Sequence, residues 1–256
     1  MRLLRLWHLW SLDAPTVAIV WTWFVARTLG ASPPTLLYWA MFCGVWGLYM
    51  LDRLLDALPI FGQKSISGLR ERHLFHRKNR YVIVILFLIC VVGAANCAAF
   101  LPFALLFQYF VVVTILALYF AAIHLWKDSE RLPKELIVGA FFAMATFLPS
   151  FEMNISQIGN VFLFGGLCTL NGLFIRSWEV EDKTRPGIFA SILAICCIVQ
   201  AYFSDASSAQ LPICMSLSVI FLLILHSVRT KVEQTTLRSC ADFSLLTPLL
   251  FSLSLP

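Results

Sequence analysis

The sequence carries little charge and lacks the short motifs of many soluble enzymes. Only 13% of its 256 residues are charged and 60% are hydrophobic, with a mean hydropathy of +0.83. Soluble domains have about 25% charged residues, so this composition excludes an ordinary soluble fold. The chain has no Gly-rich phosphate loop, no GxSxG motif and no HExxH motif. It is therefore predicted to be a polytopic membrane protein that does not use those catalytic motifs.

Cysteine and histidine show no metal-binding or disulfide pattern. The eight cysteines form no CxxC pair and have no histidine at metal spacing. Nearly all of them lie in apolar runs, which is typical of small, reduced core residues. His8, His124 and His226 are isolated in the sequence, and we expect them to be interfacial or packing residues. The net charge of +5 comes from short basic segments between apolar runs, so we expect no nucleic-acid partner.

Long apolar runs dominate the sequence instead. A helix needs about 20 apolar residues to cross the hydrocarbon core, and eight segments approach that length. A ninth, weaker segment from about 237 to 255 is expected to span the membrane or to lie along its interface. The predicted fold class is an all-α, polytopic transmembrane helical bundle of 8–9 helices, in a single domain over residues 1–256. The eight predicted spans are roughly 15–31, 35–57, 80–99, 102–126, 134–151, 157–178, 187–204 and 209–228.

The basic residues predict the orientation of these spans. With the N-terminus in the cytoplasm, only Arg27 of the 19 basic residues falls on the outer side. The outer loops near Pro102, Glu152 and Asp205 contain no Lys or Arg. Cytoplasmic loops carry an excess of Lys and Arg, so the sequence predicts an integral, multi-pass membrane protein with its N-terminus on the cytoplasmic side. One span more or fewer would scramble this pattern.

Two acidic clusters are predicted to end at the same membrane face. The second span reaches the cytoplasmic side with Asp52 and Asp56, which are four residues apart and so share one helical face. The sixth span reaches it with Asn171, Glu179 and then Asp182. Ionisable residues inside a span are costly and are functional candidates by default. We therefore predict that the two helices are neighbours whose acids face one cavity.

Basic residues are expected close to these acids. Arg53 adjoins the first cluster, Arg72 lies in the following loop, and Lys127 ends the fourth span. Mg²⁺ in proteins is usually held by a few carboxylates plus substrate phosphate oxygens, while Lys and Arg neutralise the remaining phosphate charge. A magnesium-bridged polyphosphate is thus the predicted ligand. In the simpler alternative, the acids only mark where helices leave the bilayer, with Arg53 snorkelling beside them.

The motifs resemble those of the UbiA superfamily of intramembrane aromatic prenyltransferases. Asp52-Arg53-Leu54-Leu55-Asp56 matches the latter half of the family's first acidic motif, NDxxDxxxD. The stretch ERHLFHRKNR at 71–80 lies where such proteins carry a basic loop. Lys127 with PKELIVG at 133–139 is similar to the family's Lys or Arg followed by a PQxxLG element. Residues 171–182 occupy the place of the second acidic motif, so the resemblance extends over most of the chain in motif order.

This resemblance implies an activity and a set of site residues. The implied reaction transfers an isoprenyl group from a prenyl diphosphate to a lipid-soluble, aromatic acceptor, with Mg²⁺ as the cofactor. Membrane lipid surrounds the protein in this reading. The implied catalytic residues are Asp52 and Asp56, the metal ligands are Asp52, Asp56, Glu179 and Asp182, the diphosphate-binding residues are Arg53, Arg72 and Lys127, and Tyr49 and Asn171 also line the site.

Two alternatives follow from departures within these motifs. Leu48 and Tyr49 stand where the first motif has Asn and Asp, and Lys183 stands where the second motif has an Asp. A lapsed family member would bind a lipid diphosphate or a partner without turning it over. A small cation transporter is the other alternative, although its acids would be expected at the midplane, between repeats that this sequence does not show.

Overall fold

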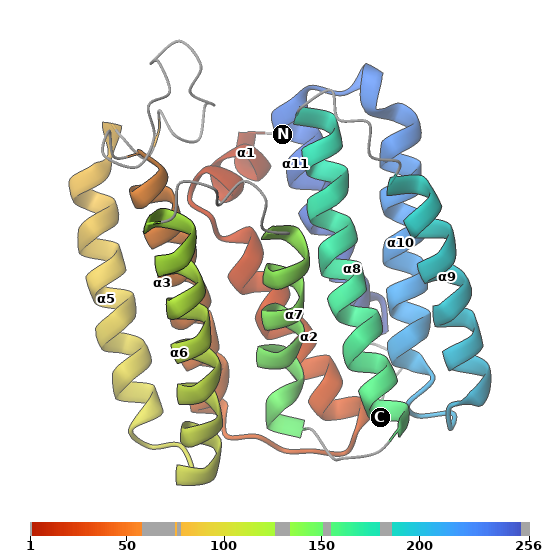
Figure 1. The fold of residues 1–256 in the computed structure, drawn as a ribbon, viewed down its shortest axis with the longest axis horizontal. Coiled ribbons are helices and arrows are strands. Elements are labelled where there is room, and N and C mark those ends of the chain that lie inside the picture. Colours follow the sequence, from red (N-terminus) through yellow and green to blue (C-terminus); the bar gives the residue numbers. More distant parts are fainter. Residues whose placement is uncertain are drawn as a thin grey trace. The chain divides into compact units, whose positions relative to one another are not determined.

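The computed structural model describes residues 2–57, 75, 78–125, 134–150, 155–179 and 186–251; it leaves out the side chains of residues 2–5, 56–57, 120, 123–125 and 179. The described residues form an all-α structure with ten α-helices (Figure 1). In chain order these helices are α1 (Arg2–Leu9), α2 (Asp13–Thr28), α3 (Thr35–Ala57), α5 (Arg80–Ala98), α6 (Phe103–Leu125), α7 (Lys134–Phe147), α8 (Ile155–Glu179), α9 (Pro186–Phe203), α10 (Gln210–Val228) and α11 (Gln234–Phe243).

Each of the eight predicted segments is helical, and its ends differ from the predicted ends by at most four residues. Prolines explain several of these ends. Pro186 begins α9, and Pro102 immediately precedes α6. Proline is tolerated in the first turn of a helix, where its missing N–H has no intrahelical partner. The second segment begins and ends at the predicted residues, Thr35 and Ala57.

Four helices in the described part of the chain are long and apolar enough to cross a membrane: Arg80–Ala98, Ile155–Trp178, Pro186–Phe203 and Gln210–Lys231. The first of them has a mean hydropathy of 2.5, yet only 11% of it is buried within the protein. Large exposed apolar surfaces mark contacts with membranes or partners. A multi-pass membrane protein explains this surface, because lipid tails can cover it.

The ninth predicted segment does not form one continuous spanning helix. The helix α11 has ten residues, and a 3-10 segment, η5 (Ser244–Phe251), follows it with a kink at Leu246 and Pro248 inside. Ten residues reach only about 15 Å at about 1.5 Å per residue, against about 30 Å of hydrocarbon. Proline cannot donate a backbone hydrogen bond, which favours this break. Both segments pack against α10.

The helices form two compact units. Unit 1 comprises residues 1–19 and 34–102, and unit 2 comprises residues 20–33 and 103–256. In unit 1, α3 packs against α5 around Met50, Ile83 and Cys90, whose exposed fractions are 1%, 1% and 2%. The indole N–H of Trp46 on α3 donates to the carbonyl oxygen of Trp10 at 2.8 Å, which fixes the turn after α1 to this core. The single domain remains a prediction.

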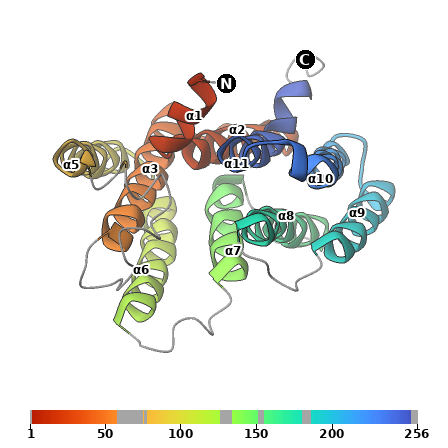
Figure 2. The same cartoon turned by 90° about the horizontal axis from the view of Figure 1, so that it is seen from above.

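Unit 2 contains the larger helical assembly. α8 contacts α7, α9, α10 and α11, and Figure 2 shows α8, α9 and α10 side by side. Trp21 is fully buried and lies 4.5 Å from Phe164, measured between ring centroids. Its indole N–H donates to the carbonyl oxygen of Leu245 at 2.7 Å. Because a buried indole N–H needs a hydrogen-bond acceptor, this contact attaches η5 to the unit's core.

Small residues let α7 approach α8 closely. A Cβ atom added at Gly139 would lie 2.5 Å from the Thr169 hydroxyl oxygen and 2.7 Å from the backbone oxygen of Gly165. A Cβ atom added at Gly165 would in turn lie 3.5 Å from the Cβ atom of Ala143. Glycine and alanine are enriched where membrane helices pack with their backbones close together. The glycine of the PKELIVG stretch therefore has a packing role between α7 and α8.

All eight cysteines are free, as expected from their spacing. Cys90, Cys197 and Cys214 are buried, whereas Cys196 is exposed. Burial raises the pKa of the Cys240 thiol on α11 above its usual value, because the charged thiolate is disfavoured away from water. That thiol is therefore a small packing group and not a reactive nucleophile at neutral pH.

Candidate functional site

Asp52 is a buried carboxylate in the last turns of α3. The residue is 8% exposed, and the helix that carries it is apolar over most of its length. Its Oδ2 atom lies 3.6 Å from a guanidinium nitrogen of Arg53, and only 12% of each side chain is exposed. A carboxylate held away from water needs a cation, a metal ion or hydrogen-bond donors. The geometry thus separates Asp52 from an ordinary solvated acid at a helix end.

The other predicted residues of the first cluster are partly described. Tyr49 lies one turn before Asp52 on α3 and is half-buried. Asp56 belongs to α3, but its side chain lies outside the described residues, as does the whole of Arg72. The four-residue spacing of Asp52 and Asp56 within one helix keeps them on one face, as predicted.

The second cluster begins on α8. Asn171 is buried in this helix, and Glu179 is its last residue, with a side chain outside the description. Lys127 and Asp182 lie outside the described residues. α3 belongs to unit 1 and α8 to unit 2, each described by itself, so a cavity shared by the two clusters remains a prediction.

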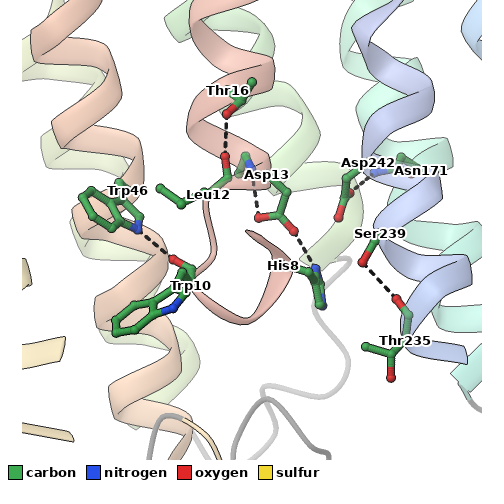
Figure 3. A network of polar contacts seen from close by, with 11 residues as sticks. His8, Trp10, Leu12, Asp13, Thr16, Trp46, Asn171, Thr235, Ser239 and Asp242 are labelled. Carbon is green, nitrogen blue, oxygen red and sulfur yellow. Dashed lines mark hydrogen bonds and ion pairs between the residues drawn. The ribbon is translucent and has the colours of Figure 1, made fainter. Parts of the chain in front are cut away.

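Asn171 has a partner that the sequence did not indicate. Its amide nitrogen donates to a carboxylate oxygen of Asp242 on α11 at 2.9 Å (Figure 3). Its amide oxygen is buried and has no hydrogen-bond partner among the described atoms. A buried acceptor without a donor costs free energy unless a ligand or water supplies one. Asn171 therefore attaches α11 to α8, and its amide oxygen remains without a donor among the described residues.

Replacing Asn171 with leucine should lower the free energy of unfolding by about 1.5–3 kcal/mol, the usual value of a hydrogen bond to a charged group. The matched control is Asn160→Leu on the same helix, because neither polar atom of the buried Asn160 amide has a partner among the described residues. Removing an unsatisfied amide should be neutral or stabilising. Thermal unfolding in detergent measures both variants, and equal losses would contradict the assigned role of the Asn171–Asp242 bond.

A buried His–Asp pair in unit 1 also escaped the sequence analysis. The Nδ1 atom of His8 lies 2.7 Å from Asp13 Oδ2, and Asp13 Oδ1 accepts the backbone N–H of Ala14 at 3.0 Å (Figure 3). His8 is 7% exposed and Asp13 is 9% exposed. His8 is buried, as expected for a packing residue, but its side chain is paired with that of Asp13, five residues further along the chain. The only signal was an acidic residue at the start of α2, and that did not identify its partner.

The end of unit 2 that carries Glu179 has further polar contacts. A guanidinium nitrogen of Arg176 lies 3.3 Å from a carboxylate oxygen of Glu135, which joins the last turns of α8 to the first turn of α7. The indole N–H of Trp178 donates to His226 Nδ1 at 3.0 Å. His226 is therefore assigned as an acceptor at Nδ1 and is not isolated in the fold. These contacts bring the ends of α7, α8 and α10 together.

Comparison with known protein families, curated proteins and solved structures found no match for this chain.

Proposed function

We propose that the protein is a UbiA-like intramembrane prenyltransferase that transfers an isoprenyl group from a prenyl diphosphate to a lipid-soluble, aromatic acceptor. The buried carboxylate of Asp52 near the end of an apolar helix carries the proposal. Charged groups in such segments are expensive, and they face a protein interior or a functional cavity. The substrate class, a prenyl diphosphate, is taken from the resemblance of the acidic motifs and their order to those of the UbiA superfamily.

Magnesium fits the donor chemistry of these residues. Asp52 offers carboxylate oxygens, and the Asn171 amide oxygen is buried without a described partner, and both are the hard oxygen ligands that Mg²⁺ prefers. The residues proposed to hold the ion are Asp52, Asp56, Glu179 and Asp182. When bound, Mg²⁺ would neutralise charge on the leaving diphosphate.

The chain's own residues have separate proposed tasks. Arg53, already within 3.6 Å of Asp52, would share the phosphate charge with Arg72 and Lys127. Tyr49 lies on α3 one turn before Asp52 and would line the prenyl chain's path. Aromatic faces stabilise a cation at close range. The Tyr49 ring would therefore favour the allylic cation that forms as the carbon–oxygen bond breaks. The acceptor's nucleophilic atom then forms the new bond to that carbon and loses its proton.

In this proposal the protein crosses the membrane eight or nine times, with its N-terminus and acidic motifs on the cytoplasmic side. The distribution of cations within unit 2 supports this orientation. Arg176 lies near Glu135 at one end, where Arg229 also follows α10, and Arg27 lies at the other end of the unit. This is the asymmetry expected when basic residues are retained on the cytoplasmic side.

The direct test uses purified wild-type protein in detergent with geranylgeranyl diphosphate, with and without Mg²⁺. We expect diphosphate release that requires the metal ion. Metal-dependent binding without release would favour the lapsed member, whose support is the occurrence of Leu48, Tyr49 and Lys183 in the motifs. If the protein neither binds nor cleaves the diphosphate, both readings are contradicted. That result would favour a transporter or a purely structural role for the acids.

A further inference from the structure

An open cavity of about 630 Å³, lined mostly by polar residues, lies at one end of unit 2, where α2 and α9 end and α8 and α10 begin. Its lining includes Arg27, Thr28, Ser156, Gln157 and Asp205. Ser156 lies in the first turn of α8, and Glu179 ends the same helix, about 34 Å away at about 1.5 Å per residue. The cavity is therefore separate from the acidic motifs. Its volume is within the usual range of small-molecule sites, about 300–1,000 Å³.

Thr28 points to a missing ligand in this cavity. The residue is 8% exposed, lines the cavity, and its hydroxyl oxygen has no hydrogen-bond partner among the described atoms. A threonine at a helix end could bond to the preceding turn, but this one does not. Leaving a hydroxyl buried and unsatisfied is costly, whereas a ligand oxygen would satisfy it.

The wall beside Thr28 is held by a specific backbone turn. Gly30 has a φ of +68°, and the N–H of Ala31 donates to the carbonyl oxygen of Ala26 at 2.8 Å. This is the bond pattern with which a positive-φ glycine closes a helix. The turn keeps Arg27 and Thr28 on the cavity wall at the end of α2.

The donors in the cavity favour an anion. Arg27 supplies a guanidinium, whose carbon lies 5.6 Å from the ring centroid of Trp23. Ser156 accepts a hydrogen bond from Gln200 at 3.4 Å, which leaves its own O–H to donate. The N-terminus of α8 adds the positive end of a 25-residue helix. Guanidinium, hydroxyls and a helix N-terminus together match a phosphate group.

The surroundings indicate a lipid source for that phosphate. Tyr202 and Phe203, at the end of α9, are 83% and 79% exposed, and Ile155, next to Ser156, is 89% exposed. Aromatic residues of this kind sit at the level of lipid headgroups. Asp205 lines the same cavity and would attract a cation near the phosphate. A carboxylate accepts hydrogen bonds from a primary ammonium but not from a quaternary one, so a phosphate joined to a primary ammonium, as in a phosphoethanolamine headgroup, fits these residues.

We propose that this cavity binds the phosphoethanolamine headgroup of a membrane lipid, with the phosphate at Arg27 and Thr28 and the ammonium at Asp205. Delipidated full-length protein in detergent is titrated with dioctanoyl phosphatidylethanolamine while its unfolding temperature is followed. We expect a saturable rise in the unfolding temperature. Dioctanoylglycerol, which lacks the phosphate, should raise the unfolding temperature little, and inorganic phosphate should raise it less than the lipid does at equal concentration.

Substitutions separate binding from folding. Arg27→Gln and Thr28→Val should each weaken the apparent lipid affinity by at least about tenfold, the value of one hydrogen bond to a charged group. Ligand-free Thr28→Val should unfold at or above the wild-type temperature, because an unsatisfied hydroxyl is removed. Asp205→Asn should reduce the preference for phosphatidylethanolamine over phosphatidylglycerol. The control Arg229→Gln alters an exposed cation after α10 and should leave the affinity unchanged.

Several results would overturn the proposal. An equal response to dioctanoylglycerol would assign the effect to the acyl chains. A full response to inorganic phosphate would assign the cavity to a soluble anion. Wild-type affinity in Arg27→Gln and Thr28→Val would remove both residues from the site, and a lowered unfolding temperature in ligand-free Thr28→Val would show that the hydroxyl has a structural partner. None of these outcomes depends on prenyl transfer, so the two proposals fail independently.

Discussion

Asp52→Asn should reduce Mg²⁺-dependent release of diphosphate by at least about 100-fold, comparable to the loss of one electrostatic transition-state contact. The change keeps the shape of the side chain and removes the charge that would bind the metal ion. Diphosphate release from geranylgeranyl diphosphate measures the effect at saturating and at limiting Mg²⁺. Glu233→Gln, at an exposed acid immediately before α11 that has no proposed role in binding or catalysis, is the matched control and should retain full activity.

The contact between Asp52 and Arg53 offers a competing explanation that the same experiment can separate. Both side chains are largely buried, so removing one charge removes a contact of the other and lowers stability. If Asp52 serves only Arg53, the double variant Asp52→Asn/Arg53→Gln should recover stability with activity unchanged from wild type. If Asp52 binds the metal ion, the double variant recovers stability and remains inactive, whereas the single variant Arg53→Gln keeps the Mg²⁺ dependence of its remaining diphosphate release. Full activity in either variant would exclude Asp52 from the mechanism.

Gly139→Ala should lower the free energy of unfolding by about 1–3 kcal/mol, and Gly139→Leu should prevent stable packing of α7, because overpacking forces a backbone to move. The added Cβ atom would lie 2.7 Å from the Gly165 oxygen and 2.9 Å from the Thr169 nitrogen, and both are backbone atoms. Neither atom can move away by a change of rotamer. Thermal unfolding in detergent, followed by tryptophan fluorescence, measures the loss.

Two other glycines calibrate this effect. A Cβ atom at Gly172 would meet the flexible side chain of Glu135 at 3.1 Å, so Gly172→Ala should cost less than Gly139→Ala. At Gly44 nothing lies within 4 Å, and alanine there should be neutral or gain up to about 1 kcal/mol from helix propensity. The expected order of loss is Gly139, then Gly172, then Gly44. An unchanged unfolding temperature for Gly139→Ala would contradict close packing of α7 on α8.

The positions of the helices could be predicted from the sequence, because in an apolar segment the backbone must satisfy its hydrogen bonds locally. The helix α3 begins and ends at the predicted residues, Thr35 and Ala57. The break in the helix around Pro248 also follows from local chemistry. The burial of Asp52 was consistent with its place at the end of an apolar run. The sequence also predicted that the cysteines would remain unpaired.

The partners of individual side chains were decided only by the tertiary structure. The pairing of Asn171 with Asp242 joins residues 71 apart in sequence, and the Trp21 bond to Leu245 joins residues 224 apart. The cavity around Thr28 likewise needs three separate chain segments at one end of unit 2. Hydropathy and charge report where a helix begins and ends, since those depend on neighbouring residues. Which face of one helix meets another depends on its rotation and tilt, which packing against distant segments sets.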